Sequence, residues 1–440
     1  MSEFDIGVGS FAILMVLIFL RMPIGLAMLV CGLGGTAFIT GGFDIVLAKL
    51  KTETYGTFSS YSLTIVPLFL LMGQFATLGG MSTALFKAAE TWLGHRKGGV
   101  AMAAIGACAG FGSICGSSLA TAATMSQAAL PELRRYGYSG GLATATLAAG
   151  GTLGILIPPS VVLVIYAILT EQNIAKLFLA AFVPGFLAAL GYMITIAIYV
   201  RVKKGQETVR EKATSGERFK ALLAVWPVLI VFFLVVGGIY LGWFTPTEAA
   251  AIGAAGTGII AYLNGGLTRK TFAESIFSTA SSTAMIFMIV LGAGFYNAFL
   301  ALSQVPQDIS MMIVDAGFSP WLVLTAILLL YLVFGCVMDS LSMILLTVPI
   351  FFPIISALEF GLTAEETAIW FGILVLIVVE VGLITPPVGM NLFVINAMDK
   401  QTPITATYMS VFPFVLSDVI RTAILVAFPG ITLFALRWFG

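Results

Sequence analysis

Long apolar runs set the strongest constraint on how this chain folds. They fall at about 6–20, 22–40, 62–78, 142–170 and 177–200, and again at about 222–242, 244–262, 281–301, 368–397 and 407–430. Most are close to the roughly 20 residues that an α-helix needs to cross a bilayer. Because 59% of the residues are hydrophobic and 10% are charged, no soluble core could hide the apolar surface. We predict an all-α integral membrane protein with about 10 transmembrane helices.

Two further apolar runs, about 99–131 and 319–355, carry a Gly/Ser-rich interruption near the middle. If each is a re-entrant hairpin, the basic segment 201–220 shares one side of the membrane with most other Lys and Arg residues. That side is then cytoplasmic by the positive-inside rule, and both termini are periplasmic. The basic residues placed there are Arg21, Lys87, Arg96, Lys97, Arg134, Arg135, Arg269, Lys270 and Lys400, whereas Lys49, Lys51, Lys176 and Arg437 fall outside and Arg421 lies inside the last span.

The two halves of the chain repeat one pattern at a nearly fixed offset. The segment 154–159, GILIPP, corresponds to 382–387, GLITPP, and Ser118 with Pro131 corresponds to Ser340 with Pro353. We therefore predict repeat 1 over 1–205, with a hairpin at about 99–131 and a broken helix at about 142–170. A cytoplasmic linker at 206–221 leads to repeat 2 over 222–440, with a hairpin at about 319–355 and a broken helix at about 368–397. An odd number of crossings per copy inverts one copy relative to the other, as in many secondary transporters.

The Pro-Pro pair in each broken helix removes two amide donors. The carbonyls of Gly154 and Ile155, and of Gly382 and Leu383, are expected to lose their helical partners. Such carbonyls are costly in hydrocarbon and survive only in a protein-lined or wet cavity. With neighbouring hydroxyls they form a hard-oxygen site that suits an alkali cation.

The hairpin tips read GSICGSS at 112–118 and GCVMDS at 335–340. A leg of about 14 helical residues rises roughly 21 Å, enough to bring a tip past the middle of the bilayer. Tip and break should meet there, with hydroxyls and helix N-termini facing an anion. The alternative is that Gly106, Gly110, Gly112 and Gly116 only permit close helix packing.

Buried charges supply further candidates. Asp339, at hairpin-tip depth, is a candidate cation ligand, substrate contact or proton carrier, and its alternative is a helix cap. Glu380 is equally consistent with support of the site and with helix capping. Asp418 and Arg421, three residues apart, are expected to pair with each other.

Other motifs are expected to have structural roles and no catalytic function. Thr245 and Glu248 form a capping box that starts a helix. Ser139, within GYSG, and the single histidine, His95, are not expected to form a hydrolytic dyad. No phosphate-binding loop occurs, zero net charge gives no case for nucleic acid, and the four cysteines read as packing residues. Amphipathic stretches at about 43–60, 80–95, 268–280 and 305–316 are expected to lie along the membrane interface.

Several runs together resemble one family, the large membrane subunit of tripartite ATP-independent periplasmic (TRAP) transporters. They are GSICGSSLATAATM, LPELRRYGYS, GGTLGILIPPS, GWFTPTEAAA, VMDSLSM and GLITPPVGMNLF, and the resemblance covers essentially the whole chain. It implies a bacterial inner-membrane permease, not an enzyme, that works with a small four-helix membrane subunit, encoded separately, and a periplasmic substrate-binding protein. It further implies sodium-driven import of organic acids such as dicarboxylates or sialic acid by an elevator motion, with two sodium ions and no organic cofactor.

The resemblance also implies site residues. The first sodium site would involve Ser113, Gly116, Gly154 and Pro158, and the second Gly335, Met338, Thr385 and Met390. The substrate would lie between them, near Ser117, Ser118, Ser160, Asp339, Ser340 and Asn391. A stand-alone transporter of the same architecture, proton coupling through Asp339 or Glu380, and an intramembrane hydrolase are the alternatives.

Overall fold

The computed structural model describes residues 2–203 and 208–439, and within these ranges every regular element is a helix. The first half contains α1 (Glu3–Phe19), α2 (Ile24–Thr40), α3 (Asp44–Phe58), η1 (Tyr61–Thr64), α4 (Ile65–Leu78), α5 (Met81–Leu93), α6 (Gly99–Cys115), α7 (Ser118–Arg135), α8 (Gly140–Leu156), α9 (Val161–Leu169) and α10 (Ile174–Val202). The second contains α11 (Ser215–Phe232), η2 (Phe233–Gly237), α12 (Gly238–Tyr240), α13 (Pro246–Leu263), α14 (Arg269–Leu302), α15 (Val305–Asp315), α16 (Pro320–Gly335), α17 (Ser340–Ser356), α18 (Ala364–Gly382), α19 (Met390–Met398), α20 (Ile404–Ala427) and α21 (Pro429–Phe439). The predicted all-α membrane fold is confirmed.

Helix length bounds the number of membrane spans. Five helices of the described residues are long and apolar enough to cross a bilayer, and six if the bent pair of α8 and α9 is one span. Helices α1 and α2 have 17 residues each, slightly short of the usual spanning length. The count of about ten spans stays a prediction.

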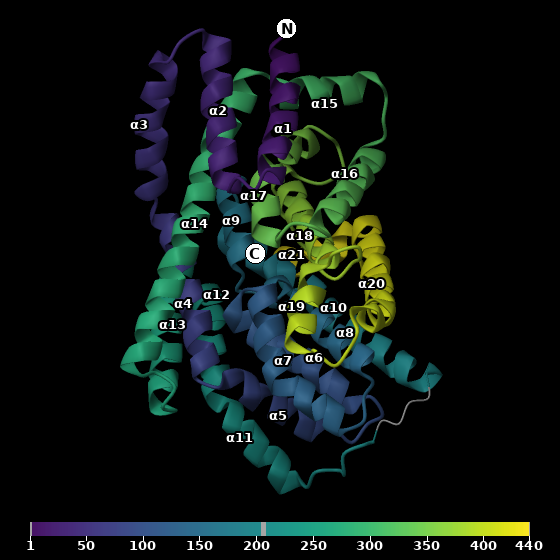
Figure 1. The fold of residues 1–440 in the computed structure, drawn as a ribbon. Helices are drawn as coiled ribbons and strands as arrows, with labels where there is room; N and C mark the ends of the chain where they lie inside the picture. Colours follow the sequence, from purple (N-terminus) through teal and green to yellow (C-terminus); the bar gives the residue numbers. More distant parts are fainter. Residues whose placement is uncertain (1, 204–207, 440) are drawn as a thin grey trace.

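The same order of elements recurs in the two halves. In each, a helical hairpin (α6–α7 and α16–α17) is followed by a helix that stops at a Pro-Pro pair (α8 and α18) and by a short helix (α9 and α19). Figure 1 shows α1 and α2 at one end of the molecule and α11 and α13 at the other. Helix α2 packs along α14, and α4 along α13, so each half supplies one member of both pairs.

One predicted boundary is wrong. The stretch at about 268–280 was expected to be an interfacial helix separate from the following span, but α14 runs unbroken for 34 residues through both. At the corresponding place in the first half the helix is interrupted, because residues 59 and 60 and the short helix η1 separate α3 from α4. Figure 1 shows α15 lying across one end of the bundle, whereas α3 runs beside α2.

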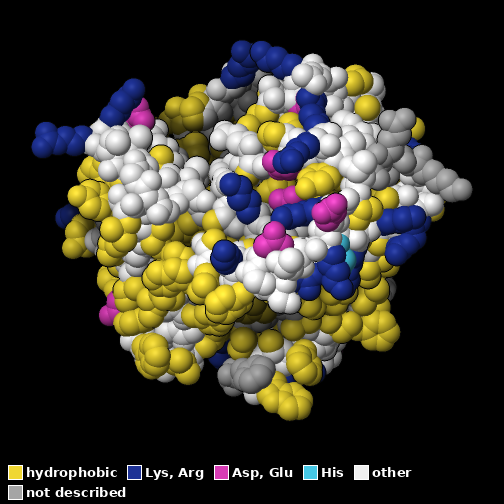
Figure 2. All heavy atoms as spheres, turned by 90° about the horizontal axis from the view of Figure 1, so that it is seen from below, with side chains coloured by type: hydrophobic (Ala, Val, Ile, Leu, Met, Phe, Trp, Pro, Cys, Tyr) yellow, Lys and Arg dark blue, Asp and Glu magenta, His cyan; other side chains and the backbone are white. Residues whose placement is uncertain are grey.

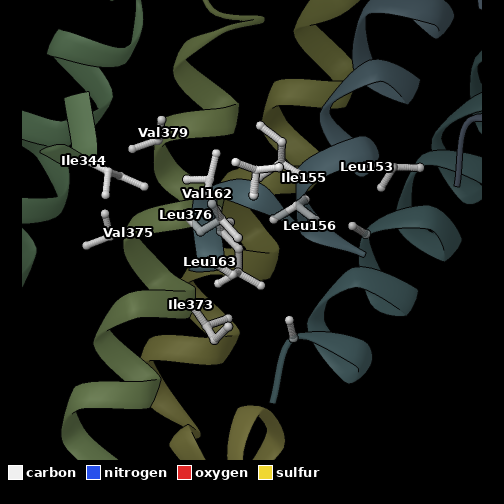
Figure 3. Packing of buried hydrophobic residues seen from close by; sticks show 14 of the residues in the cluster. Leu153, Ile155, Leu156, Val162, Leu163, Ile344, Ile373, Val375, Leu376 and Val379 are labelled. Carbon is white, nitrogen blue, oxygen red and sulfur yellow. The ribbon is translucent and has the colours of Figure 1, made fainter. Parts of the chain in front are cut away.

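The core joins the two halves around the broken helices. Leu153 and Leu156 at the end of α8, and Leu163 of α9, are buried together with Leu376 and Val379 of α18. Figure 3 shows Leu156, Leu163 and Leu376 near the centre of the view, with Val379 and Ile344 to one side and Leu153 to the other. Both broken helices therefore pack into one body with the hairpins.

Basic side chains gather at the end of the molecule that carries the α5–α6 and α7–α8 connections. Figure 2 views this end and shows Lys and Arg side chains spread over it, with acidic residues among them. Two of the ion pairs found here join Arg134 to Asp399 and Arg210 to Glu90. The assignment of this end to the cytoplasmic side stays a prediction.

Candidate functional site

The first hairpin tip lies directly against the first proline break. A β-carbon built on Gly154 would lie 2.9 Å from the carbonyl oxygen of Ser117 and 2.5 Å from the Thr121 hydroxyl. One built on Gly116, which has a φ of +63°, would lie 3.5 Å from the carbonyl oxygen of Pro159. A positive φ at a helix end favours glycine, so the sharp reversal after α6 explains Gly116.

The second tip meets the second break in the same way. A β-carbon on Gly382 would lie 2.5 Å from the carbonyl carbon of Gly335. The amide of Gly389 donates to the carbonyl of Cys336 over 3.1 Å, which ties the loop after Pro387 to the tip. The predicted contact between tip and break is therefore present in both halves.

The two breaks differ in how their carbonyls are satisfied. Pro158 and Pro159 have no N–H, so the carbonyls of Gly154 and Ile155 cannot receive a bond from four residues ahead. The second break contradicts the prediction of orphan carbonyls, because the amide of Thr385 donates to Gly382 over 3.0 Å.

The amide of Asn391 likewise donates to the carbonyl of Leu383 over 3.1 Å, so both carbonyls of the second break are paired. The physical reason is loop length. Residues 383–389 separate α18 from α19, whereas only 157–160 separate α8 from α9, and the longer segment folds back onto the helix end. Both Pro-Pro bonds are cis.

The breaks also differ in exposure. Pro158 and Pro159 are buried, whereas Pro386 and Pro387 are exposed. Tyr408 of α20 donates its hydroxyl to the carbonyl of Pro387 over 2.9 Å and so covers part of the second break. The first tip and break are thus enclosed, and the second pair is partly open.

Three predicted substrate residues converge between the halves. Ser118 of α7 and Ser340 of α17 both donate to the carboxylate of Glu380 on α18, over 2.7 Å and 2.5 Å. A β-carbon on Gly151 would lie 3.1 Å from the Ser118 carbonyl and 3.2 Å from Nδ2 of Asn391, so these two residues flank α8 together. Asn391 is fully buried and its Oδ1 has no hydrogen-bond partner. A buried amide oxygen left unpaired is costly, so it is suited to receive a ligand donor.

Other predicted site residues cap helices. The side chains of Ser117, Ser160 and Asp339 accept the amides of Ala120, Leu163 and Ser342, respectively. The caps occupy one donor at each helix start, so the N-termini at the tips are not wholly free for an anion, contrary to the prediction. Asp339 is half-buried, and its capping role, weighed as the alternative, is present in the structure.

The remaining predicted cation ligands lie at the tips and breaks, and two of them have side chains that are hydrogen-bonded elsewhere. The hydroxyl of Ser113 donates to the Gly110 carbonyl over 2.9 Å and that of Thr385 to the Val381 carbonyl over 2.6 Å. Both bonds are to the preceding turn of the same chain segment. Met338 lies within the second tip, and Met390 begins α19. A role for these residues as ligands remains a prediction.

The sequence did not predict one buried series of hydrogen bonds, which links α8, α10 and α20. The Tyr192 hydroxyl of α10 donates to Asp418 over 2.6 Å and lies 3.0 Å from the Thr152 hydroxyl of α8. Asp418 in turn pairs with Arg421 over 2.9 Å, as predicted. Nothing in the local sequence marks Tyr192, because its partner lies 226 residues away in the chain.

Two other interpretations are confirmed. Thr245 and Glu248 form the predicted capping box at the start of α13, and the four cysteines are free and buried. Ser139 accepts the amide of Leu142 and caps α8, so its GYSG motif has a structural role.

Hairpins, broken helices and a polar centre between repeated halves define a multi-pass membrane protein of the secondary-transporter class. The chain belongs to the tripartite ATP-independent periplasmic transporter family, DctM component, whose family model matches residues 11–431. The family assignment made from the sequence motifs is confirmed, and so is the expectation of a transporter in place of an enzyme.

Curated relatives match over nearly the full length. The C4-dicarboxylate TRAP transporter large permease protein DctM of Pseudomonas aeruginosa is 35% identical over 414 residues, covering 93% of this chain and 94% of that protein. The sialic acid TRAP transporter large permease protein SiaM of Vibrio cholerae is 30% identical over 429 residues and 97% of each chain. Among solved structures, the YdaH transporter of Alcanivorax borkumensis matches with a TM-score of 0.63 over 90% of each chain. At 15% identity this last likeness concerns the fold alone.

Proposed function

We propose that this chain is the permease subunit of a sodium-coupled secondary transporter that imports an organic acid. A periplasmic binding protein delivers the acid, and a small four-helix membrane subunit completes the complex in the bacterial inner membrane, with both termini periplasmic. The observation that carries the proposal is the convergence of both hairpin tips with both breaks around Ser118, Ser340 and Asn391.

The cation sites are proposed where each tip meets its break. Backbone carbonyls such as those of Ser117 and Pro159 lie at the first junction, and hydroxyl and carbonyl oxygens are the ligands that hard cations prefer. No group of three or more His, Cys, Asp or Glu residues suited to a metal occurs in 2–203 and 208–439. A site for a monovalent ion built from neutral oxygens needs no such group.

The substrate class follows from the relatives and from the polar residues between the tips. The two relatives compared above are named for C4-dicarboxylates and for sialic acid, both carboxylates. Helices α7 and α17 begin at the tips, and the positive end of a helix favours an anion, whereas the unpaired Oδ1 of Asn391 can accept a hydrogen bond from a donor elsewhere on the substrate. These features suit a carboxylate.

An elevator motion is the proposed mechanism. The hairpins and broken helices pack into one body, while α2 with α14 and α4 with α13 form pairs that join the halves elsewhere. The first break is enclosed and the second is partly open, so the two ends of the body differ in access. Movement of this body past the helix pairs would carry a bound acid across the membrane.

Reconstituted uptake tests the proposal. The chain is placed in proteoliposomes with its small subunit, and binding protein loaded with labelled C4-dicarboxylate or sialic acid is added outside. An inward sodium gradient should drive uptake of one of these acids, and removal of the gradient should abolish it. Uptake driven by a pH gradient without sodium would refute the coupling, and full uptake without binding protein or small subunit would favour a stand-alone transporter.

A further inference from the structure

Building on the proposed function, we propose that Glu380 is a positioning residue that couples the two cation sites by holding both hairpin tips at once. Its two carboxylate oxygens are shared between the halves. Oε2 accepts the hydroxyl of Ser118 over 2.7 Å, and Oε1 accepts that of Ser340 over 2.5 Å. A single side chain thus joins segments that lie 262 and 40 residues from it in the sequence.

Both serines occupy the same structural position. Ser118 is the first residue of α7 and Ser340 the first residue of α17, and each follows the residue that caps its helix at the tip. A shift of either tip must therefore displace one of the two hydroxyls from Glu380. Each displacement breaks a buried hydrogen bond, so it is resisted.

The bridge is shielded from water. Glu380 is 1% exposed, Ser118 1% and Ser340 4%, so a lost hydroxyl contact cannot be replaced freely by solvent. None of the ion pairs found in the described residues includes Glu380. Its partners are the two tip serines, and the starts of α7 and α17 present partial positive charge toward it.

Only one half contributes such a bridge. Aligning Gly154 with Gly382 places Thr152 at the position equivalent to Glu380. Thr152 is bonded instead to the carbonyl of Ala149 and lies beside the Tyr192 hydroxyl, so it contacts neither tip through a hydrogen bond. Both halves contain a break, but only the second half contributes a side chain that is hydrogen-bonded to both tips.

A cation that fixes one tip against its break fixes the serine of that tip, and through Glu380 it restrains the other tip. Binding at either site then favours binding at the other by the same factor, as linkage requires. Uptake should therefore rise with sodium concentration with a Hill coefficient near 2, the limit for two coupled sites.

The test compares hydroxyl deletions in reconstituted uptake with the small subunit and binding protein. Ser118→Ala and Ser340→Ala should each lower the Hill coefficient toward 1 and raise the half-saturating sodium concentration about tenfold, within the range of typical coupling. The double variant should be no worse than either single one, because a bridge with one broken end no longer couples. Ser126→Ala is the matched control, since this buried serine of α7 bonds only to the Ala122 carbonyl of its own helix.

Substitution of the carboxylate separates positioning from charge. Glu380→Gln keeps one acceptor and gains a donor that a serine hydroxyl can accept, so it should retain most of the cooperativity, whereas Glu380→Ala should lose it. Three results would overturn the inference. They are additive effects of the two serine substitutions, a Hill coefficient that is unchanged in all variants, and an equal loss of cooperativity in Glu380→Gln and Glu380→Ala. If uptake by the wild-type protein does not depend on sodium, the proposed function is refuted, and the coupling of cation sites is refuted with it.

Discussion

Gly112→Ala probes the contact between the first tip and the first break. A β-carbon at this position would lie 2.9 Å from the amide nitrogen of Gly154 and closer still to its α-carbon. Both atoms belong to the backbone of α8, which cannot turn aside as a flexible side chain does. Helices α6 and α8 must separate, and overpacking of this kind costs about 1–3 kcal/mol.

The gain from replacing a helical glycine offsets part of that cost. Alanine is favoured over glycine within a helix by up to about 1 kcal/mol, so the net destabilisation is about 2 kcal/mol at the upper end. If about 1.4 kcal/mol of the strain is relieved when the tip moves off the break, sodium binding weakens about tenfold. We expect a lower melting temperature and a half-saturating sodium concentration raised by about that factor.

Gly106→Ala is the matched control on the same helix. Its β-carbon would meet only the terminal methyl of Met193, at 3.4 Å, so the substitution should be neutral or stabilising. Thermal unfolding in detergent and sodium-dependent uptake in proteoliposomes measure both variants. A Gly112→Ala protein with wild-type melting temperature and sodium dependence would refute the proposed contact between tip and break as a determinant of cation binding.

Three further substitutions test other parts of the site. Asp339→Asn should abolish uptake while leaving the melting temperature nearly unchanged, because asparagine caps α17 as well as aspartate does; normal uptake would leave Asp339 only its capping role. Burial raises the pKa of Asp399, but hydrogen bonds from Thr402, the Gln401 amide and Arg134 outweigh this effect and lower the pKa overall. The ionised Asp399 therefore stabilises the fold at neutral pH, and this stabilisation is lost as the pH falls below about 4. Asp399→Asn should flatten the acid part of the melting profile, and an unchanged profile would contradict this assignment. Tyr192→Phe should destabilise the protein by about 1–3 kcal/mol, because a buried oxygen of Asp418 loses its donor; Tyr199→Phe, whose 3.3 Å contact with Ser410 is weak, should change the melting temperature little.

Local rules in the sequence predicted much of the site. A Pro-Pro pair removes amide donors wherever it stands, so the ends of α8 and α18 were predictable from Pro158 and Pro386 alone. Helix spacing predicted the pair between Asp418 and Arg421. In each case the interaction that determines the local structure involves only a few residues close together in the sequence.

The features that were missed or left open depend on residues far apart in the sequence, or on positions where the sequence carries no local signal. Glu380 meets Ser118 only because the halves fold together, and no local pattern distinguishes it from a helix cap. The carbonyl of Gly382 is paired because the loop after it is long enough to return, which the proline pair does not reveal. The fusion within α14 went unpredicted because an amphipathic helix and an apolar helix follow each other without Pro or Gly between them.

The continuous α14 also bears on how insertions are tolerated. One added residue turns everything that follows it in a helix by about 100°. An insertion between Ala280 and Ser281 would therefore rotate the α2-facing side of α14 away from its partner, whereas one after Ser59 lengthens a joint that already interrupts the helices. Corresponding places in the two halves thus differ in what they tolerate, and the second half cannot change length there without losing the register between α14 and α2.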